Sequence, residues 1–298
     1  MNCKLRITKN DLRSVYMKCI KCGRTKSGKK KFFICEDCRK FSEIILQIAE
    51  ETESEISSAE SLDIETHDIF RLLTDIGFTT TLNPHTAIFH NLSSVLLDKA
   101  LRDQSEVSEE ELNKEIRTTK SWTDALELFE DAELIEVKTE RYKRILIPTK
   151  RIEKIAKEFY MDGALSDQVD KRSAHFCSGY VMLQLLKKVA EMKEITDKES
   201  LPYGQRPRTL WTIAMFLWIN AFEKNEGFDE EQFRKFVGKR GIPTSTWSRI
   251  IRGLETVDSR ATQGMIKQMG FKSGIRTFKY EDYVPRVMER LRERGRMR

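Results

Sequence analysis

Apolar residues recur at helical spacing along most of this 298-residue chain. Between residues 41 and 66 they fall at Phe41, Ile44, Ile45, Ile48 and Ile56, which gives one apolar face and one acidic face. The same periodicity predicts further helices over residues 67–75, 92–102, 109–116, 121–132, 151–160, 179–192, 209–222, 230–239, 244–254 and 264–271. The expected fold class is therefore mainly α.

Runs of β-branched and aromatic residues predict a few short strands between these helices. The expected strands are residues 31–34, 78–82, 87–89, 134–137, 144–148 and 275–280. The pair 134–137 and 144–148 encloses a polar tip at residues 138–143, which predicts a β-hairpin.

Residues 91–149 combine three successive helices with that hairpin, and the sequence from Ser108 to Glu111 predicts a capping box at the start of the second helix. This order resembles winged-helix DNA-binding domains over about 60 residues. The resemblance implies that the third helix enters the major groove, which assigns Lys120 at its start to DNA, and that the basic wing contacts phosphates. The wing residues are Lys138, Arg141, Lys143 and Arg144. The third helix and the residues directly after it also hold five carboxylates, Asp124, Glu127, Glu130, Asp131 and Glu133, which a phosphate backbone would repel, so a protein-binding role for this unit stays open.

A second helix-turn-helix pattern follows the proline-containing segment 201–208. Gly241 can end one helix, Pro243 sets the turn, and Thr244 or Ser245 can cap the next helix. That helix presents donors suited to base edges and phosphates, and Arg276 lies on the strand that follows. The donors are Thr244, Ser245, Thr246, Ser248, Arg249 and Arg252.

Two CxxC pairs near the N-terminus provide the most specific chemistry. Cys19 and Cys22 form one pair and Cys35 and Cys38 the other, with twelve residues between them. This spacing is typical of a zinc ribbon, in which four thiolates enclose one structural zinc ion and leave no open position for water. Two disulfides are the alternative, but no secretory signal is evident and a reducing compartment favours the metal.

Charge is divided unevenly along the chain. Residues 1–40 contain 13 Lys/Arg and 3 Asp/Glu, residues 226–298 contain 17 and 10, and residues 41–225 contain 23 and 34. The two ends are therefore basic and the middle is acidic, which places polyanion contacts at the ends. In the N-terminal segment the candidate contacts are Lys26, Lys29, Lys30 and Lys31.

Catalytic motifs are missing from the sequence. We find no glycine-rich phosphate loop, HExxH, GxSxG or nucleotide fingerprint, so we expect no enzyme, and a nuclease or recombinase lacks a supporting motif. The longest mainly apolar run, residues 210–219, is too short to cross a bilayer, which predicts no membrane association. We expect a cytoplasmic, nucleoid-associated protein.

These patterns divide the chain into modules. They are a zinc ribbon at 1–40, an acidic helical connector at 41–66, a winged helix-turn-helix at 67–150, a helical spacer at 151–200, a linker at 201–208 and a basic helix-turn-helix domain with an arginine-rich end at 209–298. This order resembles the transcription factors of archaea and the regulators of archaeal viruses and plasmids.

The resemblance implies a regulator that binds double-stranded DNA and contacts RNA polymerase or a general transcription factor. A homodimer would predict a palindromic DNA site. A replication-initiation or partition protein would have the same DNA-binding chemistry. The alternative of another class is an adaptor that binds only protein within the transcription machinery.

Overall fold

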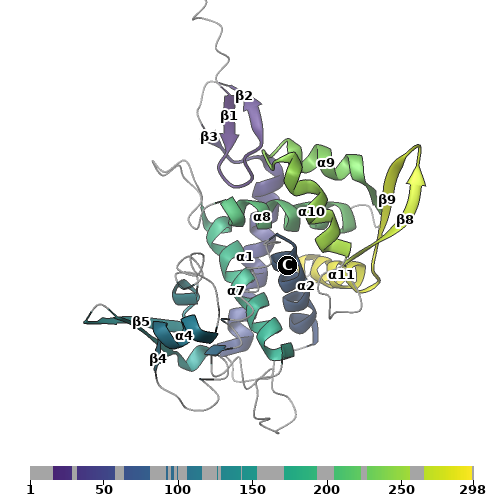
Figure 1. The fold of residues 1–298 in the computed structure, drawn as a ribbon. Coiled ribbons are helices and arrows are strands. Elements are labelled where there is room, and N and C mark those ends of the chain that lie inside the picture. The colour runs from purple at the N-terminus through teal and green to yellow at the C-terminus, as the bar shows by residue number, and fades with distance from the viewer. Residues whose placement is uncertain are drawn as a thin grey trace, which may run out of the picture.

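The computed structural model describes most of the helical and stranded parts of the chain. The described residues are 16–28, 32–57, 64–80, 92, 95, 96, 99, 106–115, 126, 129–141, 143–152, 171–192, 205–222, 227–255 and 265–296. The described residues are mainly helical, as the sequence predicts, and among them are three small sheets of three strands each (Figure 1). Over these residues, no helix combines the length and apolarity needed to cross a bilayer.

Four helices form the central body. They are α1 (Glu36–Ser57), α2 (Ile64–Thr80), α7 (Lys171–Glu191) and α8 (Gln205–Leu217), the last continuing into one π-helical turn, Trp218–Phe222. The α2 and α7 helices pack along each other, with the rings of Phe70 and Tyr180 5.8 Å apart. Gly179 permits this approach, because a Cβ there would lie 2.3 Å from the carbonyl oxygen of Phe70.

A small sheet precedes α1. Its strands are β1 (Tyr16–Cys19), β2 (Thr25–Ser27) and β3 (Phe32–Phe33), in the order β2-β1-β3. The β1–β2 pair is antiparallel and the β1–β3 pair is parallel, so the two cysteine pairs are brought to the same end of the sheet.

The first helix-and-hairpin unit lies at the lower left of Figure 1. It contains β4 (Val107–Ser108), α4 (Glu109–Glu115), β5 (Ile135–Glu140) and β6 (Lys143–Pro148), with strand order β4-β6-β5. The predicted capping box is confirmed: the backbone N–H of Ser108 donates to Glu111, and the N–H of Glu111 donates back to the Ser108 hydroxyl. Residues 126 and 129–131, which precede β5, are helical.

The second unit repeats this order of elements near the C-terminus. Its elements are β7 (Phe228–Asp229), α9 (Glu230–Gly238), α10 (Thr244–Glu255), β8 (Ile266–Lys272) and β9 (Ile275–Tyr280), with strand order β7-β9-β8. Asp229 caps α9, and Gly241 turns the chain with a φ of +74° before α10. The α11 helix, Tyr283–Arg296, then packs on α2, where the Tyr283 hydroxyl donates to buried Asp75.

Several expected boundaries differ from the structure. Residues 78–80, expected in a strand, end α2, while the expected strand 87–89 lies outside the described residues. Residues 266–271, expected in a helix, form most of β8, because pairing with β9 decides their conformation. Residues 205–208, expected in a linker, begin α8, and α7 starts at Lys171 rather than Gly179.

We predict that Gly179→Ala lowers the free energy of unfolding by about 2 kcal/mol, because the new methyl group must push α7 away from α2. Thermal or denaturant unfolding measures the loss. The matched control is Glu191→Ala at the exposed end of α7, which should change stability little. Equal stability of the two variants would contradict the close packing of α2 on α7.

Candidate metal centre

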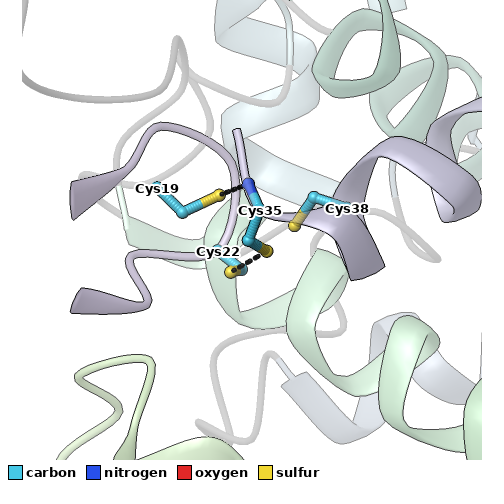
Figure 2. Close-up of side chains that lie close together, drawn as sticks. All are labelled: Cys19, Cys22, Cys35 and Cys38. Atoms are coloured by element: carbon cyan, nitrogen blue, oxygen red, sulfur yellow. Dashed lines mark hydrogen bonds between the residues drawn. The ribbon is translucent and has the colours of Figure 1, made fainter. Parts of the chain in front are cut away.

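The four predicted cysteine ligands come together in a buried cluster. The sulfur atoms of Cys19, Cys22, Cys35 and Cys38 all lie within 4.8 Å of one another (Figure 2). A tetrahedron with metal–sulfur bonds of about 2.3 Å has edges of about 3.8 Å, and the Cys22 and Cys35 sulfurs are 3.7 Å apart. The cluster can therefore hold one metal ion with sulfur ligands on all four sides.

Local backbone geometry aims each pair of sulfurs inward. The N–H of Gly23 donates to the carbonyl of Cys19 and the N–H of Cys19 to the carbonyl of Arg24, which closes the first CxxC turn. Gly23 has a φ of +76°, a conformation that side chains disfavour. Cys35 directly precedes α1 and Cys38 is the third residue of the helix; the N–H of Arg39 donates to the Cys35 carbonyl, so the second pair lies at the first turn of α1.

Hydrogen-bond donors point at the sulfurs from the protein around them. The Trp211 indole N–H lies 3.2 Å from the Cys38 sulfur, and the backbone N–H of Cys35 lies 3.4 Å from the Cys19 sulfur. Such donors favour thiolates, which are the metal-binding form of cysteine. The donor set, its burial and its geometry all fit a metal ion.

The four thiols lie so close together that they cannot all lose their protons unless a cation lies among them. Hydrogen bonding from neighbouring cysteines lowers the pKa of Cys19, and hydrogen bonding together with burial raises the pKa of Cys38. A divalent cation would remove this conflict, because its charge stabilises several thiolates at once.

Three positive side chains lie on, or bond to, residues of the two CxxC segments. Buried Lys21 donates to the Ser42 hydroxyl and to the Ala190 carbonyl, near the end of α7, and its ammonium lies 5.6 Å from the centre of the Trp211 ring. Arg24 and Arg240 both donate to one carboxylate oxygen of Asp37, which lies between the second pair of cysteines. These cations offset the negative charge that four thiolates keep around a divalent ion.

The cluster is also attached to the turn of the second unit. Arg240, 3% exposed, precedes Gly241 in the α9–α10 turn, and its guanidinium lies 2.9 Å from Asp37. A Cβ at Gly23 would lie 2.8 Å from the Arg240 carbonyl oxygen, so the first cysteine turn rests directly on the α9–α10 turn. The cysteine cluster and the α9–α10 turn are therefore in direct contact.

The candidate nucleic-acid residues that the structure describes lie on β2, on the β5–β6 hairpin and on α10 and β9 of the second unit. Lys26 is exposed on β2, while Lys29, Lys30, Lys31 and Lys120 lie outside the described residues. Lys138, Arg141 and Lys143 are exposed at the β5–β6 hairpin and Arg144 is half-buried there. Lys143 pairs with Glu110 of α4 at 3.3 Å.

The α10 candidates share one face of their helix. Thr244, Ser245, Ser248, Arg249 and Arg252 are exposed and Thr246 is half-buried. The opposite face buries Ile250, Ile251 and Leu254. Arg276 differs from these, because it is half-buried and donates to Glu230 at 2.8 Å, which lowers the pKa of that carboxyl group. Its guanidinium joins β9 to α9.

Sequence reasoning did not find the residues that support the cluster from outside. Trp211 lies 173 residues from Cys38 along the chain, and Arg240 lies 203 residues from Asp37. No local spacing predicts such pairs. The one available signal was that a lysine, Lys21, stands inside a CxxC turn.

We predict that the purified protein binds one Co²⁺ per chain with the thiolate-to-metal absorption bands of tetrahedral sulfur coordination. Cys22→Ser should abolish tight binding because it removes one of four ligands. Cys177→Ala, a change at a buried cysteine outside the cluster, should leave the spectrum intact. A native protein that binds no metal would contradict the assignment.

The Asp37 contact yields a separate prediction. Asp37→Asn should lower the free energy of unfolding by about 2 kcal/mol, because buried Arg240 loses its counter-charge. The neighbouring Glu36→Gln is the matched control, since Glu36 and its partner Arg39 are both exposed and such pairs contribute about 0.5 kcal/mol. Equal losses of unfolding free energy in denaturant titrations would show that the Asp37–Arg240 pair stabilises the fold no more than the exposed pair does.

Comparison with known proteins adds no relative to this description. No protein-family model, curated protein or solved structure matches the chain. The functional argument therefore rests on the residues themselves.

Proposed function

We propose that this protein is a DNA-binding transcription regulator with one structural zinc ion. The thiolate set, closed to water, suits zinc in a structural rather than a catalytic role. We interpret residues 16–40 as a zinc ribbon. We interpret the two helix-and-hairpin units as winged helices, which have the order strand, helix, helix, hairpin.

The exposed face of α10 is the observation that supports DNA binding most directly. It presents hydroxyl and guanidinium donors, and residues 244–254 contain no carboxylate. Hydroxyl and guanidinium groups are the usual donors to phosphates and to base edges in the major groove. The buried apolar face holds α10 on the body and leaves the polar face to a partner.

The first unit favours a protein partner instead. Its α4 helix begins with Glu109, Glu110 and Glu111, and Glu136 and Glu140 accompany the basic residues of its hairpin. Phosphates would be repelled by this mixture. We propose that this unit contacts the transcription machinery, such as RNA polymerase, while α10 contacts DNA. The two hairpins extend to opposite sides of the body, which permits both contacts at once (Figure 1).

We predict that affinity for duplex DNA falls steeply with salt, and that Arg249→Glu with Arg252→Glu removes specific binding and lowers the slope of log Kd against log salt by about 2. Electrophoretic mobility shift or fluorescence anisotropy measures both. Lys138→Glu with Arg141→Glu makes the same charge change on the first unit and should retain most of the affinity. Unchanged DNA affinity of the Arg249/Arg252 variant would exclude α10 as the helix that contacts the DNA.

A further inference from the structure

Two large apolar side chains are exposed on one strand of the second unit. Met269 is 62% and Phe271 is 68% exposed, and they are the exposed large hydrophobic residues of the described part of the chain. Both belong to β8, which with β9 forms the hairpin at the right edge of Figure 1. Exposed apolar residues that are gathered on one element mark a contact surface.

A β-bulge sets the direction of Phe271. Gln268 pairs with Phe278 and Gly270 pairs with Thr277, so Met269 is the extra residue. Phe271 then lies opposite Arg276, whereas regular pairing would place it opposite Ile275 on the other face of the hairpin. Gly270, directly after the extra residue, has a φ of +146°, a backbone conformation that favours glycine. The bulge therefore decides from which face of the hairpin Phe271 projects, and the Phe271 ring stays exposed there.

The charge around these residues indicates the partner. Residues 265–280 contain Lys267, Lys272, Arg276 and Lys279 and no carboxylate. Lys267 and Lys279 are exposed and directly opposite each other, an arrangement that costs stability unless an anion lies nearby. A second copy of the chain docked through this hairpin would bring the same lysines together, which disfavours a dimer. A polyanion with an apolar interior can contact the lysines through its negative groups and the exposed apolar side chains through its interior.

We infer that the tip of the β8–β9 hairpin inserts Phe271 between base pairs of duplex DNA, with Met269 beside it and the lysines on the flanking phosphates. Apolar side chains placed between base steps unstack them and bend the duplex. This inference deepens the proposed function, because α10 would hold the duplex that the hairpin deforms. TA steps, which unstack most easily, are the expected insertion points.

A labelled duplex tests the insertion. The probe is a duplex of about 30 base pairs that contains several TA steps, carries 2-aminopurine in those steps and has a donor and an acceptor dye at its ends. On saturation with the full-length zinc-loaded protein, 2-aminopurine fluorescence should rise and energy transfer between the ends should increase. Anisotropy on the same samples measures binding separately.

Phe271→Ala should bind roughly tenfold more weakly, since stacking of an aromatic ring on a base is lost, and should show neither signal at saturation. Phe271→Trp should restore both signals. Lys272→Ala is the matched control: it should weaken binding and lower the salt slope by about 1, yet keep both signals at saturation. Because residues 271 and 272 are exposed, these variants should have the same unfolding temperature as the native protein.

The outcomes separate the two proposals. Binding by the native protein without either signal, or signals retained by Phe271→Ala, would overturn the insertion and leave DNA binding in place. No binding of the native protein to any duplex would overturn both. Sedimentation in which the native chain is a dimer and Phe271→Ala a monomer would assign the apolar residues to self-association instead.

Discussion

Four cysteine sulfurs that must approach within 4.8 Å of one another are the constraint on which the N-terminal half of the molecule depends. Cys19 ends β1 and Cys22 lies in the turn that follows, while Cys35 directly precedes α1 and Cys38 lies in its first turn. Because thiolates repel each other unless a cation joins them, the proposed metal ion would hold the sheet to the helix. Trp211 of α8 and Arg240 of the α9–α10 turn extend this effect to distant segments.

The two helix-and-hairpin units share one order of elements but differ in the partners that we propose for them. Each has a short strand, a capped helix and a hairpin, yet carboxylates line the first and cations dominate the exposed residues of the second. The helices of the body separate the two units, so the acidic first unit does not lie beside the proposed DNA contact (Figure 1). Charge, rather than topology, distinguishes their proposed roles.

Much of this fold follows from local sequence signals, and the failures have a common physical cause. Cysteine spacing, the Ser108 capping box and the Gly241 turn are decided within a few residues, and the sequence predicts each correctly. Residues 264–271 were predicted as a helix, but residues 266–271 belong to β8, because their conformation depends on pairing with β9. The contacts of Asp37 and Trp211 join segments far apart in the chain, which no local pattern records.

The central claim is that the metal centre positions the α9–α10 turn, and amide hydrogen exchange of the native protein with and without a chelator tests it most directly. The account predicts that metal removal accelerates exchange at the start of α1 and across residues 239–248, while the β5–β6 hairpin, which lies far from the cluster, is unchanged. Amide exchange rates in α9 and α10 that do not change when the metal is removed would contradict the claim.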